Sequence, residues 1–334
     1  MTTMRDVASL AGVSTSTVSH VLNKTRYVEP ETTARVQDVI RTLNYEVDGV
    51  AKSLRVRSTS TFALIIPDLT NPFFPELATA IQHNAAQAGY DVVILNVDLP
   101  GGTGPNLFDH YLRAIRRKRY DVVIFAETLP MDATSRDRLV STGTPVVLIS
   151  GIPHPGVDRV YIDDYTAARE VTAYLISRGH TLIGHIIGAP GMQSAVDRRR
   201  GYHDSLLAAG LPCSPELEAP GTFQRDGGSA GMRQLLSRTP RPTAVFAAND
   251  LTALGALLAC VDAGVHVPGE IAIAGFDDIA LAADLRPALT TVYHGQREIG
   301  AEVVRLALAR ARHEAPEEYS TIIVPHRLVV RHSA

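Results

Sequence analysis

The chain has 334 residues, 45% of them hydrophobic and 20% charged, so it can bury more than one core and we expect a small domain beside a larger bilobed one. The two cysteines, Cys213 and Cys260, are too few for a disulfide framework. The sequence shows no apolar signal region and no apolar run of membrane-spanning length, which argues against secreted and membrane-spanning proteins. We therefore expect a cytoplasmic protein. The net charge of −3 excludes a generally basic nucleic-acid coat, but residues 1–60 carry eight Lys or Arg and six Asp or Glu, so attraction for phosphate is confined to that end.

Residues 4–23 predict two short helices joined by a turn. Thr3 and Asp6 have the spacing of a capping box, and Gly12 supplies the left-handed residue that ends the first helix. Ser14 is the expected cap of the second helix. On that helix the inward face is apolar, with Val18, Val21 and Leu22, whereas hydrogen-bonding side chains share the outer face, namely Thr15, Ser16, Ser19 and His20. Such a helix is a candidate for reading the major groove of DNA.

A third helix is predicted from Pro30 onward. Proline is favoured at the first position of a helix, and Val36, Val39, Ile40 and Leu43 then follow at helical spacing. Three helices that share one apolar face make a minimal core.

These motifs give the chain a close resemblance to the lactose-repressor (LacI/GalR) family of bacterial transcription regulators. The matching segments are Asp6-Val7-Ala8, Ala11-Gly12-Val13-Ser14, Thr17-Val18-Ser19, Val21-Leu22-Asn23, Leu43-Asn44-Tyr45 and Ala51-Lys52-Ser53-Leu54-Arg55. The resemblance implies a helix-turn-helix DNA-binding domain over 1–46, a hinge helix and linker over 47–58, and a bilobed effector-binding and dimerisation domain over 59–334. It therefore implies a homodimeric repressor that binds a near-palindromic double-stranded operator and has no cofactor, no metal and no membrane partner.

The hinge segment is too short to be a stable isolated helix, so we expect it to order only with DNA and a second subunit. The family inserts such a helix into the minor groove, where paired leucines wedge a base step open, and Leu54 and Lys52 match that motif. The expected DNA contacts are Thr15, Ser16, Thr17, Ser19, His20, Asn23, Lys52 and Leu54. The chain departs from the family at Val47-Asp48, at Glu29 and at His20, which replace the usual Pro-Asn, Ser and Arg.

Past residue 60 the pattern becomes alternating strands and helices. The apolar runs are Phe62–Ile66, Val92–Leu95, Val122–Phe125, Val146–Ile149, Leu182–Ile187, Ala244–Ala247 and Ile271–Ala274, each expected to precede a helix. Continuous Val/Ile runs are buried on both faces, so we predict an α/β core of two doubly wound parallel sheets, similar to a periplasmic binding protein. The final stretch, with a helix over 295–311 between Thr290–Tyr293 and Ile322–Val324, is expected to cross back between lobe 1 (about 59–160 and 292–321) and lobe 2 (about 161–291 and 322–334).

Polar residues that follow these strands are candidates for an effector site, because ligands bind beyond the carboxyl ends of parallel strands. The resemblance implies effector contacts from Asn249, Asp277 and the arginine of the Arg198-x-x-Gly201-Tyr202 motif, with Phe73, Phe74 and Phe223 as aromatic walls and Ser194 as a further candidate. For Asp164 and Asp250, helix capping is an equally good interpretation.

The residues leave the identity of the effector open. Aromatic faces with Asp, Asn and Arg suit a sugar, but they also suit a nucleobase or nucleoside acting as a co-repressor. Ser150 stands where the family often has Asp, which removes one acceptor. Whether the ligand weakens or strengthens DNA binding depends on which lobe arrangement it favours.

Two other functional classes are weaker alternatives. No nucleophile elbow, phosphate-binding loop, H-E-x-x-H motif or metal-spaced Cys/His cluster is present, so an enzyme is not expected, and His180 and His185 have a structural interpretation. A solute-binding protein would not carry residues 1–58. Residues 325–334 show no apolar heptad repeat, so assembly is expected to stop at a dimer.

Overall fold

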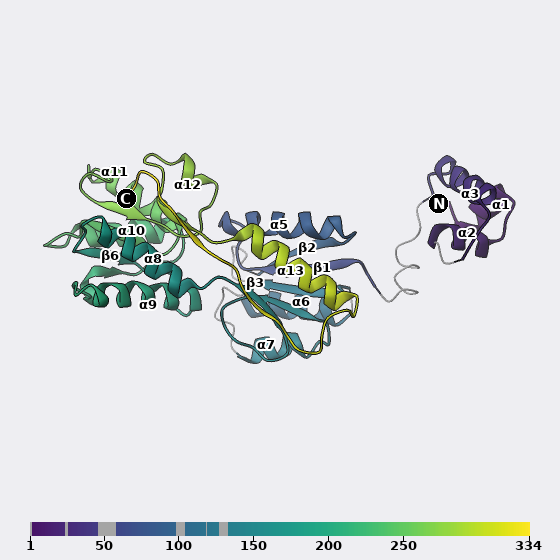
Figure 1. Cartoon of the computed structure of the whole chain (residues 1–334), viewed down its shortest axis with the longest axis horizontal. Coiled ribbons are helices and arrows are strands. Elements are labelled where there is room, and N and C mark those ends of the chain that lie inside the picture. Colours follow the sequence, from purple (N-terminus) through teal and green to yellow (C-terminus); the bar gives the residue numbers. More distant parts are fainter. Residues whose placement is uncertain (1, 24–25, 46–57, 98–103, 118, 127–132) are drawn as a thin grey trace. The chain divides into compact units, whose positions relative to one another are not determined.

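A computed structural model describes residues 2–23, 26–45, 58–97, 104–117, 119–126 and 133–334 (Figure 1). The chain divides into two compact units, residues 1–59 and 60–334. Each unit has its own hydrophobic core. Residues 47–57 of the predicted hinge and linker, including Val47, Asp48, Lys52 and Leu54, lie outside the described residues.

The first unit is a three-helix domain made of α1 (Met4–Ala11), α2 (Thr15–Asn23) and α3 (Pro30–Thr42). The predicted caps are confirmed: the Thr3 backbone N–H donates to Asp6 at 2.7 Å, Gly12 has φ 65°, and the Thr17 N–H donates to Ser14 Oγ at 3.1 Å. Arg35 Nε donates to the Ala11 carbonyl at 3.0 Å, which ties α3 to the end of α1. The core residues are Val7, Ala8, Ala11, Val18, Val21 and Val36.

The second unit contains two parallel sheets, as the apolar runs predict (Figure 1). The first sheet has the strand order β11-β5-β4-β3-β1-β2, and the second has the order β7-β6-β8-β9. The strands of the first are β1 (Thr61–Ile66), β2 (Asp91–Asn96), β3 (Val122–Ala126), β4 (Val146–Ile149), β5 (Asp158–Tyr161) and β11 (Thr321–Ile323). Those of the second are β6 (Ile183–Ile186), β7 (Glu218–Ala219), β8 (Ala244–Ala247) and β9 (Ala272–Ala274).

Helices cover both faces of each sheet. The first lobe, built on the first sheet, includes α5 (Phe73–Gln87), α6 (Gly104–Arg116), α7 (Ala133–Val140) and α13 (Gln296–Ala311). The second lobe includes α8 (Asp164–Ser177), α9 (Gln193–Ala208), the short helix η1 (Pro215–Leu217), α10 (Arg225–Leu236), α11 (Asp250–Asp262) and α12 (Leu281–Asp284). In β1, Phe62, Leu64 and Ile66 pack toward α5, while Ala63 and Ile65 pack in a separate cluster with residues of α6 and α7. Burial on both faces explains the uninterrupted apolar run.

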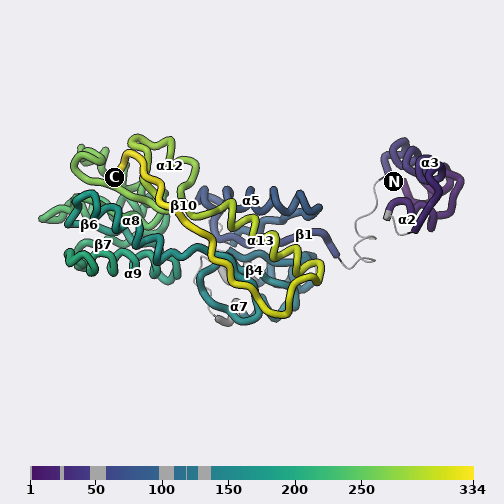
Figure 2. The backbone as a smooth tube through the Cα atoms, in the orientation of Figure 1, coloured from purple at the N-terminus to yellow at the C-terminus, as the bar shows by residue number. Residues whose placement is uncertain are grey.

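The chain crosses between the lobes more than once. After β5 it enters α8, after β10 (Thr291–Tyr293) it enters α13, and after β11 it returns to β12 (Arg327–Val329), which pairs antiparallel with β10. Figure 2 shows this last return as the yellow C-terminal tube running back to the second lobe. No helix in the described part of the chain combines the length and apolar character that a membrane span requires.

Three expectations need correction. The run Val146–Ile149 is followed by strand β5 and not by a helix, and the run ending at Ala274 leads only to the four-residue α12. Strand β11 pairs with β5, so the sheet of the first lobe includes Ile322 and Ile323, beyond the expected limit at 321. Strands β5 and β7 were not expected. They are short and lack a long apolar run, and they form because they pair with neighbouring strands of the sheet.

Candidate functional site

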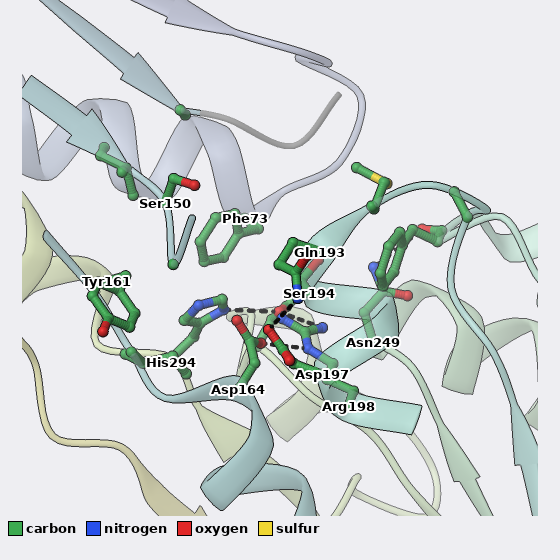
Figure 3. Close-up of a pocket in the computed structure, with 18 of the residues that line it drawn as sticks. Phe73, Ser150, Tyr161, Asp164, Gln193, Ser194, Asp197, Arg198, Asn249 and His294 are labelled. Carbon is green, nitrogen blue, oxygen red and sulfur yellow. Dashed lines mark hydrogen bonds and ion pairs between the residues drawn. The ribbon is translucent and has the colours of Figure 1, made fainter. Parts of the chain in front are cut away.

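A cavity of about 440 Å³ lies between the two lobes and is lined by both (Figure 3). All seven residues expected at the effector site line it, although they come from separate elements: Phe73, Phe74, Ser194, Arg198, Phe223, Asn249 and Asp277. Ser150 also lines the cavity. Figure 3 places Arg198, Asp164 and Asp197 near one another, with His294 and Phe73 beside them.

Arg198 is held in place by several partners. It lies on α9 of the second lobe, and only 3% of the residue is exposed. Its Nε donates to Asp164 Oδ1 at 2.7 Å and its Nη1 donates to the Ala248 carbonyl at 2.6 Å. The guanidinium carbon lies 3.7 Å from the centroid of the Phe276 ring. These contacts hold the guanidinium in place before any ligand binds, so the Arg198 side chain loses little conformational entropy on binding.

Asp277 faces Arg198 from the loop after β9. Its Oδ1 lies 3.7 Å from Arg198 Nη1 and 3.2 Å from His294 Nδ1. The Asp277 backbone has φ 112° and is locked by hydrogen bonds from its N–H to the Val292 carbonyl and from Gln296 Nε2 to its own carbonyl. A non-glycine residue at such a φ is strained, and strain of this kind concentrates at functional sites.

His294 is a cavity residue that the sequence did not indicate. It follows β10, and its ring lies 4.7 Å from that of Phe73 in the first lobe and meets the Phe276 ring edge-on at 5.5 Å. It therefore connects the aromatic wall of one lobe to the carboxylate of the other. The sequence feature that could have indicated His294 is its position directly after a predicted strand, where ligand-binding residues are expected.

Asn249 both caps a helix and faces the cavity. Its Oδ1 accepts from the Thr252 N–H at 2.9 Å and from Thr252 Oγ1 at 2.7 Å, and its Nδ2 donates to the Phe223 carbonyl at 3.1 Å. The capping role and the predicted cavity position are compatible, because a cap at a strand's carboxyl end points into the cleft.

The two aspartates with open interpretations have different positions. Asp164 lines the cavity and holds Arg198, while the cap of α8 is its neighbour Asp163, which accepts from the Thr166 N–H at 3.0 Å. Asp250 is fully buried in the second lobe and accepts from Thr291 Oγ1 and the Ile279 N–H. Burial, followed by the charge of Asp277, raises the pKa of Asp250 well above its usual value. Its role is structural.

Aromatic rings form part of the cavity wall. Phe73 and Phe74 pack edge-to-face with centroids 5.1 Å apart. Phe223 has φ 63°, and its ring lies directly over Gly188, where a Cβ would overlap it. Glycine at 188 is thus required for Phe223 to occupy its place beside the cavity.

Hydrogen bonds to side chains of the first lobe also join the two lobes across the cleft. Gln224 Nε2 donates to Asp68 Oδ2 at 2.8 Å, and the Ala280 N–H donates to Glu76 Oε1 at 2.9 Å. Burial, together with the nearby charges of Asp277 and Asp278, raises the pKa of the Glu76 carboxyl. Opening the cleft must break both contacts.

The structure describes the side chains of five of the α2 residues expected to contact DNA. Thr15 and Ser16 are exposed, while Thr17, Ser19 and His20 are partly buried. Asn23 ends α2; its side chain, and all of Lys52 and Leu54, lie outside the described residues.

The surroundings of His185 fit the structural role expected of it. His185 is fully buried between the rings of Phe246 and Tyr202, and its Nδ1 lies 2.8 Å from the Phe246 carbonyl. Burial lowers the pKa of His185 to about 4. Within the described residues no three His, Cys, Asp or Glu side chains are grouped as a metal site would require.

Known proteins resemble this chain over its whole length. Residues 3–48 match the model of bacterial regulatory proteins of the lacI family, and residues 172–334 match that of a periplasmic binding protein-like domain. The ribose operon repressor of Escherichia coli (strain K12) is 36% identical over 312 residues, which cover 93% of each chain. The HTH-type transcriptional repressor PurR of Haemophilus influenzae (strain PittEE) is 33% identical over 337 residues, covering 100% of this chain and 98% of the relative.

A solved structure of the lac repressor dimer bound to operator and the anti-inducer ONPF is similar to this chain in fold. It aligns with a TM-score of 0.88 and 25% sequence identity, covering 99% of this chain and 98% of that one.

Proposed function

The chain belongs to the lacI family of bacterial regulatory proteins, and from this premise we propose that it represses transcription as a homodimer whose operator affinity is set by a sugar or sugar derivative bound in the interlobe cavity. A protein that binds bacterial DNA acts in the cytoplasm, and we place it there.

The observation that carries the proposal is the convergence of Arg198, Asn249 and Asp277 on one cavity beside aromatic rings. Carboxylate and amide oxygens accept from pairs of sugar hydroxyls, the guanidinium donates to them, and an aromatic ring covers the apolar face of the sugar. A relative named for the ribose operon supports a sugar as the ligand class. Ligand contact with both lobes would change the free-energy difference between open and closed arrangements.

A nucleobase or nucleoside acting as a co-repressor is the second candidate. Phe73 and Phe74 offer rings on which a planar base can stack, and Asp277 and Arg198 can pair with its donor and acceptor edge. A co-repressor strengthens operator binding, so an effector of this class should lower the Kd of the protein for its operator.

On the DNA side, we propose that the α2 residues Thr15, Ser16, Thr17, Ser19, His20 and Asn23 contact the major groove, and that Lys52 and Leu54 enter the minor groove. Two copies related by a two-fold axis would read the two halves of a near-palindrome. The operator-bound dimer of the lac repressor supports this arrangement.

The test has two stages with the full-length protein. Selection from random duplexes should return a near-palindromic site, and a metabolite screen by thermal shift should find a ligand that raises Tm by mass action. Arg198→Ala should lose that shift. Arg199→Ala is a matched control, because Arg199 is the next residue of α9 and also pairs with a carboxylate, Glu218, but does not line the cavity. Selection of no site, or a ligand response unaffected by Arg198→Ala, would overturn the proposal.

A further inference from the structure

The charges that line the interlobe cavity are mostly negative. Its described lining includes five aspartates, at 68, 163, 164, 197 and 277, and only two arginines, at 198 and 200. With His294 neutral, the formal charge of this lining is −3. A cleft with low-dielectric walls focuses such a field, so it raises the local concentration of cations and lowers that of anions.

The two arginines already have carboxylate partners. Arg198 donates to Asp164, and its Nη1 is also bonded to the Ala248 carbonyl. Arg200 Nη2 lies 3.2 Å from Asp197 Oδ1, and its guanidinium carbon lies 4.4 Å from the centroid of the Tyr165 ring. A phosphate in the cavity would have to compete with these carboxylates for each guanidinium, and it would add two negative charges beside them.

Uncharged hydroxyl groups meet no such obstacle. The carboxylates of Asp164 and Asp277 keep acceptor capacity beyond their contacts with Arg198 and His294, since each ionised carboxylate offers about four lone-pair sites. A hydroxyl can donate to these oxygens, and an ammonium group can do so with an added Coulomb attraction.

We propose that this cavity selects effectors that are uncharged or carry an amine, and rejects the phosphorylated or carboxylated form of the same molecule. This rests on the proposed effector function and restricts its ligand class. Like charges placed together repel each other, so the expected discrimination against a phosphorylated analogue is roughly 100-fold in Kd.

The experiment measures thermal shifts and calorimetric affinities of the full-length protein with matched ligands. The probes are D-ribose and D-ribose 5-phosphate, D-glucose, D-glucosamine and D-glucose 6-phosphate, cellobiose, and adenosine and adenosine monophosphate. At least one uncharged or amino probe should raise Tm and bind roughly 100-fold more tightly than its phosphorylated partner. A phosphorylated probe that binds as tightly and alters operator binding would overturn this inference while leaving the regulator function intact. If no uncharged or amino probe binds while the protein still binds its operator, the inference is overturned. If the protein also fails to bind any operator, the proposed function itself is contradicted.

One variant tests the electrostatic cause. Asp197→Asn removes a carboxylate that lines the cavity and releases Arg200, so the preference for the uncharged ligand should fall by roughly tenfold. Asp262→Asn is the matched control, because Asp262 is an exposed carboxylate near the end of α11 that does not line the cavity. An unchanged preference in Asp197→Asn, or an equal change in both variants, would contradict the proposed cause.

Discussion

Replacement of Asp277 separates its charge from its backbone role. Asp277→Ala removes the oxygen that lies 3.2 Å from His294 Nδ1 and 3.7 Å from Arg198 Nη1, and it places alanine at φ 112°. Loss of a hydrogen bond to a charged group is worth about 1.5–3 kcal/mol, so effector affinity should fall by roughly 10- to 150-fold. Asp277→Asn keeps an acceptor and a side chain that tolerates positive φ, so it should retain the fold and lose part of the affinity.

Asp278→Asn is the control for these two variants. Asp278 also has a positive φ, of 53°, but it pairs with Arg331 Nη2 at 2.6 Å and does not line the cavity. Calorimetric titration with the effector found in the screen should rank the affinities wild type and Asp278→Asn first, Asp277→Asn next and Asp277→Ala last. Operator binding without ligand should be preserved in all four proteins. Normal effector affinity in Asp277→Ala would refute the assignment of this residue to the effector site.

Four further predictions concern DNA reading, assembly and pH. Leu54→Ala should weaken operator binding by a few kcal/mol and reduce DNA bending in gel-shift assays while leaving effector binding unchanged; unaltered bending would exclude the wedge. His20→Ala should lower discrimination at one symmetric base-pair position by roughly 1–3 kcal/mol with an unchanged salt slope, whereas uniform weakening with a shallower slope would assign His20 to the phosphates. Light scattering coupled to size exclusion at micromolar protein should give a dimer mass, and a stable tetramer would contradict this. Burial lowers the pKa of His185 to about 4, so as the pH falls the unfolded chain protonates this imidazole before the folded protein does. The free energy of unfolding should therefore fall by about 3 kcal/mol between pH 6.5 and 4. Urea unfolding of His185→Gln should show a weaker pH dependence than that of the wild type.

The local features of the chain could be predicted from its sequence. The capping box at Thr3, the left-handed Gly12 and the uninterrupted apolar run of β1 depend on neighbouring residues or on burial of both faces, and each takes the predicted form. Strand β5 could not be predicted in this way. It has only four residues, and its buried Asp158 is stabilised by Arg310 of α13, whose Nε donates to Oδ2 at 2.7 Å.

The contacts across the cleft were also beyond the sequence. His294 meets Phe73, and Gln224 meets Asp68, only because the chain crosses between the lobes and returns. Asn249 was expected to contact the effector, and the geometry gives it a helix cap as well as a place in the cavity lining. For Asp164 and Asp163, a shift of one residue decided which side chain caps α8 and which holds Arg198.

The most direct test of the account is operator affinity measured by fluorescence anisotropy while the identified effector is titrated into wild-type protein and into Arg198→Ala. The account predicts that the effector shifts the Kd of the wild type for operator by at least about fivefold, the low end of measured coupling between sites. It also predicts that Arg198→Ala binds the operator normally and does not respond. A ligand that binds the wild type without changing operator affinity, or an Arg198→Ala protein with a full response, would contradict control of DNA binding through this cavity.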